Sequence, residues 1–97
     1  MAVIETHTFR LADGADVDGF LDADRRVQTE LMLRKPTFLR RTTARGGNGD
    51  WLVVVLWASE ADAEASRVHF ADDPLNAAFM SFVDEAAITS RRYETLD

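Results

Sequence analysis

Two ionisable side chains of this sequence are expected to point toward apolar neighbours, where they could carry out acid–base chemistry. The first is His7, in residues 3–11, where apolar and polar side chains alternate as they do along a strand. Phe9 and Leu11 lie on the same side of that strand, so the core-facing side includes the imidazole. The second is Asp24. Together they could take a proton from an acidic phenol or enol, whose carbanion then reacts with oxygen.

Asp24 lies in a helix predicted over residues 16–33, with Asp16 as its N-cap and Lys35-Pro36 as its stop. It is in the middle of the apolar stripe of this helix, which is formed by Val17, Phe20, Leu21, Val27 and Leu31. An unpaired carboxylate among apolar neighbours is costly, so Asp24 must take up a proton or find a partner. A helix rotated about its axis would instead expose it.

Aromatic and polar side chains elsewhere are candidates for binding a small apolar ligand. They are Phe9, Phe20, Gln28, Phe38, Trp57, His69, Phe79 and Phe82. Simpler interpretations are a core-edge histidine for His7, a surface residue for His69, and core or interface aromatics for Trp51 and Trp57. The pattern does not bring three or four metal ligands together, and it has no nucleotide-binding or dinucleotide-binding motif. We therefore expect no metal and no cofactor.

Residues 51–57 form the strand around which the chain is organised. The run is short, apolar at every position and bounded by Gly49-Asp50 and Ser59, which favours a strand over a helix. One face carries Trp51, Val53, Val55 and Trp57, and the other carries Leu52, Val54 and Leu56. Both faces must therefore be covered from water.

Two further helices are predicted after this strand. Ser59 caps the first, whose inward residues are expected to be Ala61, Ala65 and Val68, with His69 at the border. Asp73 caps the second, which has Pro74 at its first position and ends at Asp84-Glu85. Its inward residues are expected to be Leu75, Ala78, Phe79 and Phe82.

The remaining pattern predicts a strand over residues 38–43, a hairpin loop over 45–50 and an edge strand over 88–96. The order is β-α-β-β-α-β, an α+β ferredoxin-like fold with a four-stranded antiparallel sheet. Right-handed crossovers place the helices on one face of the sheet. The other face is then a bare apolar surface, and a second copy packed sheet to sheet is its simplest cover. We expect a homodimer.

Length and composition exclude several classes of protein. The 97 residues form one domain, residues 1–97, and without cysteine the chain has neither disulfides nor thiolate chemistry. Its net charge of −6 disfavours nucleic acid as a partner. No stretch approaches the roughly 20 apolar residues of a membrane span, and the start does not resemble a signal peptide. We expect a cytoplasmic protein with no nucleic-acid or membrane partner.

Several stretches resemble the dimeric α/β-barrel superfamily, and within it the antibiotic-biosynthesis-monooxygenase-like group. The similar residues are Pro36-Thr37-Phe38-Leu39, Trp57-Ala58-Ser59-Glu60-Ala61, Asp73-Pro74 with Phe79, and Tyr93. The resemblance implies a dimer that closes into an α/β barrel, with a pocket between sheet and helices where His7 and Asp24 would point. It implies a cofactor-independent monooxygenase of an apolar aromatic, polyketide-like substrate. The alternative is a non-catalytic dimeric module for ligand binding or interaction.

The same superfamily group includes haem-degrading enzymes, and their pattern differs from this sequence. Those enzymes carry an Asn on the first strand, a Trp beyond the third strand and a His on the following helix. His7 and Arg67 stand at the first two positions here, and the third has no clean match because the gap around Asp72-Asp73 moves it toward Phe79. We therefore expect that haem is not a substrate.

Overall fold

The chain folds into one antiparallel sheet with its helices packed against one face. The computed structural model describes residues 1–34 and 38–96. The strands, in the spatial order β2-β3-β1-β4, are β1 (Val3–Arg10), β2 (Phe38–Arg45), β3 (Asp50–Trp57) and β4 (Thr89–Glu94). The helices are α1 (Val17–Arg26), the π-helical η1 (Val27–Leu31), the 3-10 turn η2 (Met32–Arg34), α2 (Glu60–Phe70), α3 (Pro74–Met80) and the 3-10 turn η3 (Glu85–Ala87).

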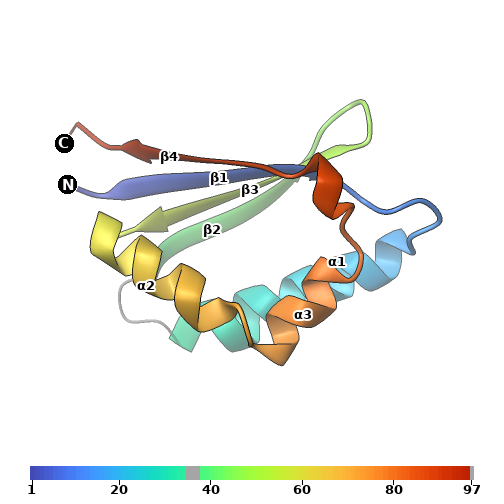
Figure 1. The fold of residues 1–97 in the computed structure, drawn as a ribbon, viewed down its shortest axis with the longest axis horizontal. Coiled ribbons are helices and arrows are strands. Elements are labelled where there is room, and N and C mark those ends of the chain that lie inside the picture. The colour runs from blue at the N-terminus through green and yellow to red at the C-terminus, as the bar shows by residue number, and fades with distance from the viewer. Residues whose placement is uncertain (35–37, 97) are drawn as a thin grey trace.

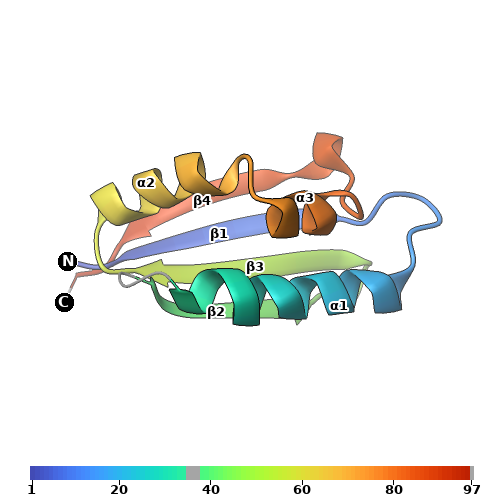
Figure 2. The same cartoon turned by 90° about the horizontal axis from the view of Figure 1, so that it is seen from below.

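The layers confirm the ferredoxin-like fold. Figure 1 shows the sheet edge-on with every labelled helix on the same side of it. In Figure 2, turned by 90°, α1 runs along β2 and β3, whereas α2 and α3 run along β1 and β4. The two ends of the described chain meet beside the sheet, where the Thr95 amide donates to the Ala2 carbonyl. No helix of the described residues, 1–34 and 38–96, covers the second face of the sheet.

β3 lies inside the sheet and is apolar on both faces, as expected. Its side chains toward the helices are all buried: Trp51, Val53, Val55 and Trp57. Those on the other face remain half-buried: Leu52, Val54 and Leu56. The register places Ile4 between Leu56 and Tyr93, which extends this apolar surface across three strands. We call the surface formed by Ile4, Leu52, Val54, Leu56 and Tyr93 the open face.

The first helix is continuous from α1 through η1 and η2, and its buried stripe differs from the prediction at one position. Phe20, Ala23, Val27 and Leu31 are buried, whereas Leu21 is 41% exposed. The prediction that Leu21 points inward is wrong because Ala23 completes the i, i+3, i+7 face with Phe20 and Val27. The expected stop at Lys35-Pro36 lies outside the described residues.

α2 is rotated relative to the expected face. Its buried residues are Ala63 and Ser66, and Phe70 packs against the core. The residues expected inward are exposed: Ala61, Ala65 and Val68, with His69 beside them. Alanines occur on several sides of this helix, so small apolar residues alone did not define its buried face. The large ring of Phe70, 6.3 Å from Trp57 between ring centroids, decides the orientation.

α3 is shorter than expected, because it ends at Met80 rather than near Asp84. Phe79 is buried and Leu75 and Phe82 pack on the core as predicted, but Ala78 is exposed, which corrects its inward assignment. After the helix the chain is tied back to β1, since the Asp84 amide donates to the Arg10 carbonyl. None of the described helices combines the length and apolar character needed to cross a membrane.

Candidate functional site

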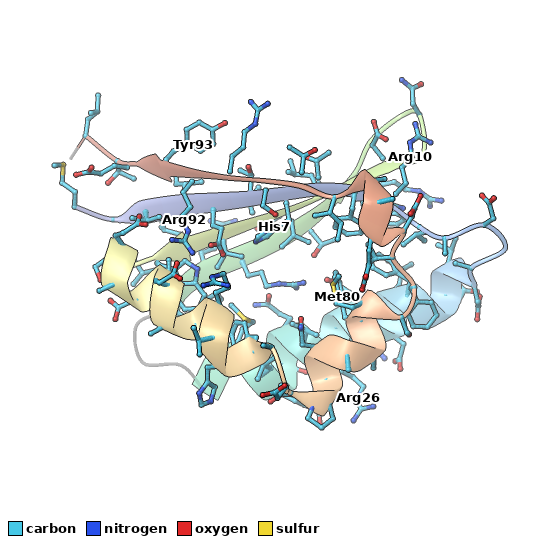
Figure 3. All side chains as sticks on the ribbon, in the orientation of Figure 1. His7, Arg10, Arg26, Met80, Arg92 and Tyr93 are labelled. Carbon is cyan, nitrogen blue, oxygen red and sulfur yellow. The ribbon has the colours of Figure 1, made fainter. Side chains whose placement is uncertain are left out.

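A cavity of about 470 Å³ lies between the helix-facing side of the sheet and the helices. Apolar side chains form most of its wall, and among the predicted binding residues it is lined by Phe9, Trp57 and Phe79. His7 also lines it, and Figure 3 shows this side chain pointing from β1 toward the helices. A pocket of this size and character fits a small, largely apolar molecule.

His7 is held on both ring nitrogens by neighbours on the sheet. Its Nδ1 lies 2.8 Å from Ser90 Oγ, and its Nε2 lies 3.3 Å from Glu5 Oε1. Ser90 is the cross-strand partner of His7 on β4, and Glu5 is two residues away on β1, so both project to the helix side. The imidazole side chain is 34% exposed and therefore remains accessible from the cavity.

Glu5 is the carboxylate that organises this end of the cavity. It accepts hydrogen bonds from Trp57 Nε1 at 3.4 Å and from Arg92 Nε at 3.0 Å. Burial acts to raise the pKa of Glu5, but the hydrogen bonds from His7 and Arg92 outweigh it and hold the pKa below its usual value. An ionised Glu5 accepts a hydrogen bond from Nε2–H of His7, which assigns the free lone pair to Nδ1 and lets Nδ1 accept a hydrogen bond from the Ser90 hydroxyl.

Arg92 links this network to the helix layer. Besides Glu5, its guanidinium contacts Glu60 and Glu64 of α2, each at 2.9 Å through Nη1. Figure 3 shows Arg92 reaching from β4 toward α2. The hydrogen bonds that Arg92 donates to these carboxylates raise its pKa, with the bond to Glu5 as the strongest contributor. Arg92 thus connects Glu5 in the cavity wall to the carboxylates of α2.

Asp24 does not belong to the cavity wall, which corrects the expected pairing with His7. Its Oδ1 atom accepts from Arg41 Nη2 and from Thr43 Oγ1, both at 2.7 Å. The two ion-pair side chains are largely buried, at 5% exposure for Arg41 and 15% for Asp24. The carboxylate therefore found its partner on β2, and Glu5 occupies the place beside His7. Any catalytic role for Asp24 remains a prediction, and one that would act through Arg41.

The other predicted binding residues lie around the cavity without lining it. Phe20 is fully buried against the rings of Phe9, Trp51, Phe79 and Phe82, so it is a core residue, and Phe82 packs beside it. Phe38 meets Trp57 edge-on at the start of β2. His69 is exposed because α2 is rotated, and Gln28 is half-buried on η1.

The cavity wall also contains polar residues that were not among the predicted site residues: Glu5, Arg41, Ser66, Arg67, Asn76, Ser90, Arg91 and Arg92. Glu5 could have been predicted from the sequence, because it lies two residues before His7 in the same strand and therefore points to the same core-facing side. The pairing of Ser90 with His7 depends on the register of β4, which no local pattern fixes. Arg41 could be identified only once it was known which residue pairs with Asp24.

This arrangement is suited to removing a proton. A ligand in the cavity can lose a proton to His7, either directly or through the Ser90 hydroxyl that lines the same wall. The ionised Glu5 stabilises the imidazolium that forms. Among the described residues, no group of three or more His, Asp or Glu side chains is arranged to hold a metal ion.

Comparison with known proteins identifies relatives through structure. No protein-family model matches the chain, and no curated protein matches its sequence. SnoaB, a cofactor-independent oxygenase from Streptomyces nogalater, superposes with a TM-score of 0.77 at 13% identity, covering 99% of this chain and 94% of that one. A candidate antibiotic biosynthesis monooxygenase from Caulobacter crescentus gives 0.78 at 16% identity, covering 99% and 91%. A dimeric ferredoxin-like protein of unknown function from Jannaschia gives 0.74 at 9%, covering 98% and 100%.

These likenesses extend over nearly the whole of each chain. They confirm the resemblance to the antibiotic-biosynthesis-monooxygenase-like group at the level of the fold. Identities this low leave the chemistry to be argued from the residues of the cavity itself.

The ion pair between Asp24 and Arg41 predicts that Asp24 contributes more to stability than the neighbouring Asp22. Asp24→Asn removes one charge of a largely buried pair and strands Arg41, so we expect a loss of about 3 kcal/mol in the free energy of unfolding. Asp22→Asn on the same helix breaks only an exposed pair with Arg25 and should cost less than about 0.5 kcal/mol. Denaturant unfolding of both variants beside the parent measures this. Equal losses would contradict a structural role for the pair.

The Glu5 network predicts how stability depends on pH. Because the pKa of Glu5 is lower in the folded state than in the unfolded chain, where it is about 4.3, its stabilisation is complete above that value. It is lost as the pH falls from about 4.3 through the folded pKa. The unfolding free energy of Glu5→Gln should therefore fall less steeply than that of the parent over this window.

Denaturant unfolding at a series of pH values from neutral to acid tests this expectation. Glu85→Gln, an exposed glutamate, controls for the change in net charge. A Glu5→Gln variant whose stability falls as steeply as that of the parent would show that the network does not hold the Glu5 carboxylate.

Proposed function

We propose that this protein is a homodimeric, cofactor-independent oxygenase of a small aromatic molecule with an acidic phenol or enol. The observation that carries the proposal is the cavity of about 470 Å³ in which an apolar wall surrounds His7, held between Glu5 and Ser90. The shared fold with SnoaB, itself a cofactor-independent oxygenase, supports the same reading. The substrate supplies the electrons that oxygen requires, and the protein supplies a base and a dry surface.

The proposed reaction begins when His7 takes a proton from the substrate. The carbanion gives electrons to O₂, and a carbon–oxygen bond forms at the carbon that carried the proton. The second hydrogen of that carbon leaves with the other oxygen atom as water, so a CH₂ group and O₂ become a C=O group and H₂O. His7 returns its proton in the same cycle. The apolar wall favours this sequence because it keeps solvent protons away from the carbanion.

The dimer part of the proposal rests on the open face. Its apolar side chains come from β1, β3 and β4 and have no cover within the described chain. A second copy packed there would bury the apolar centre of both sheets, as expected for an obligate interface of about 2,000 Å² or more. The dimeric ferredoxin-like protein from Jannaschia shares the fold and supports this arrangement.

Oxygen consumption with anthrone-like phenols tests the proposed activity. We expect the parent to consume one O₂ per substrate without added metal or cofactor, and His7→Gln to lower kcat by about 10²- to 10⁴-fold, as for loss of a general base. His7→Gln should change the unfolding free energy by only about 0.5 kcal/mol, because the side chain lines a cavity rather than the core. His69→Gln, an exposed histidine outside the cavity, is the matched control and should keep full activity.

Two results would count against this function. Binding of the phenols without any oxygen consumption would favour the non-catalytic ligand-binding module. An unchanged rate in His7→Gln would remove the imidazole from the chemistry.

The open face predicts that a charge at its centre disrupts assembly. Val54→Asp should dissociate or unfold the protein, since a carboxylate in an apolar interface has no partner. Val68→Asp is the matched control because Val68 is 64% exposed on α2, on the helix side of the molecule. Native mass measurement at micromolar concentration gives the oligomeric state. A parent that is a stable monomer at that concentration would overturn the dimer.

A further inference from the structure

We infer that the molecule bound in this cavity carries a carboxylate or similar anionic group, and that Arg41 receives it. This inference rests on the proposed function, because it assigns the chemical class of the ligand to the same cavity. Arg41 would be a specificity-determining residue at the β2 side, across β3 from His7. Its positive charge is presented to an otherwise largely apolar space.

The position of Arg41 is fixed by its neighbours. Its Nη2 donates to Asp24, and its guanidinium carbon lies 5.7 Å from the ring centroid of Phe79, which lines the same cavity. Thr43 Oγ1 donates a hydrogen bond to the same oxygen of Asp24 that Arg41 contacts. With only 5% of the side chain exposed, the guanidinium is pre-organised and cannot swing into solvent. Rigid placement of this kind suits recognition of a planar anion.

Two donors of Arg41 have no partner within the protein. Among the described residues its hydrogen bond goes through Nη2 to Asp24, which leaves the Nε and Nη1 donors unused. Neither nitrogen is fully buried, since Ser66 Oγ is the unpartnered side-chain atom that is fully buried among those residues. Arg41 lines the cavity, so the cavity is where a ligand would meet these donors.

Stability alone does not explain why this position holds an ion pair. A buried pair of this kind can be replaced by apolar side chains of similar volume without loss of stability. Its presence beside a hollow space is better explained by a ligand that uses the free donors. Arg67 and Arg92 of the same wall are engaged by Glu64 and by Glu5 with Glu60, and Arg91 has the strand parity of Tyr93 on the open face. Arg41 is paired with Asp24 through one nitrogen only, so it is the largely buried cation of the wall that keeps donors for an anion.

The spacing of the two polar ends indicates the shape of the ligand. Arg41 on β2 is aligned with Val55 and Glu5, whereas His7 on β1 is aligned with Val53. The two are therefore two strand spacings, about 10 Å, apart across the sheet and two residues, about 7 Å, apart along it. Val53 and Val55 form the apolar floor between them. A fused-ring aromatic fits this floor with its carboxylate at Arg41 and its acidic C–H or phenol near His7.

The test compares two probes that differ only in charge: 9-anthracenecarboxylate and the neutral 9-anthracenecarboxamide. Fluorescence titration at neutral pH should give at least tenfold tighter binding of the carboxylate by the parent, which corresponds to about 1.4 kcal/mol. In the double variant Arg41→Gln with Asp24→Asn, both charges are removed together and no charge is stranded. There the ratio should fall to about one, while the affinity for the carboxamide stays unchanged.

Arg26→Gln is the control for the loss of one arginine charge, because Arg26 is exposed on the first helix and does not line the cavity, and this variant should keep the tenfold ratio. Equal binding of both probes by the parent would overturn the inference without needing any variant. A ratio that survives in the double variant, or that collapses in Arg26→Gln, would also overturn it. In each of these cases the aromatic-binding function stands. Failure of both probes to bind would overturn the inference and the proposed aromatic-binding cavity together.

Discussion

The burial of β3 on both of its faces is the constraint on which the rest of this structure depends. Trp51 and Trp57 stand at the two ends of its helix-facing side, where they meet Phe20 and Phe70. Only valines lie between them, at positions 53 and 55. The large rings at both ends hold the helices away from the sheet, and the short side chains in the middle leave space unfilled. The cavity is therefore a consequence of where large and small residues fall along one strand.

The charged groups near this cavity have partners supplied by neighbouring elements. Cross-strand pairing brings Arg92 opposite Glu5, while Asp24 reaches Arg41 from the first helix. Burial without such partners would be costly for a carboxylate. In consequence the fold, rather than a ligand, satisfies the charged groups on both sides of the cavity. His7 on one side and Arg41 on the other are held in place before a ligand enters.

Much of the fold could be predicted because it follows from local periodicity. The alternation in residues 3–11 gave the inward side of His7 correctly, and the unbroken apolar run gave β3. The argument that Asp24 needed a partner also held, but its identity depended on which strand lies beneath the first helix. For α2, alanines on several sides left the buried face undetermined, so His69 was misplaced. Register between distant strands, which brings Ser90 to His7, has no signature in either segment.

A fold shared at such low sequence identity does not show that two proteins catalyse the same reaction. The case for function therefore depends on how much stability the polar residues around the cavity cost this chain. Arginine, glutamate and histidine side chains around a hollow space contribute less to stability than an apolar core filling the same volume. Ser66 Oγ, buried without a partner among the described residues, adds to that cost. Structural needs alone would favour filling the space. Polar groups that lose stability in the empty protein and can regain it on binding are the arrangement expected of a site built for a ligand.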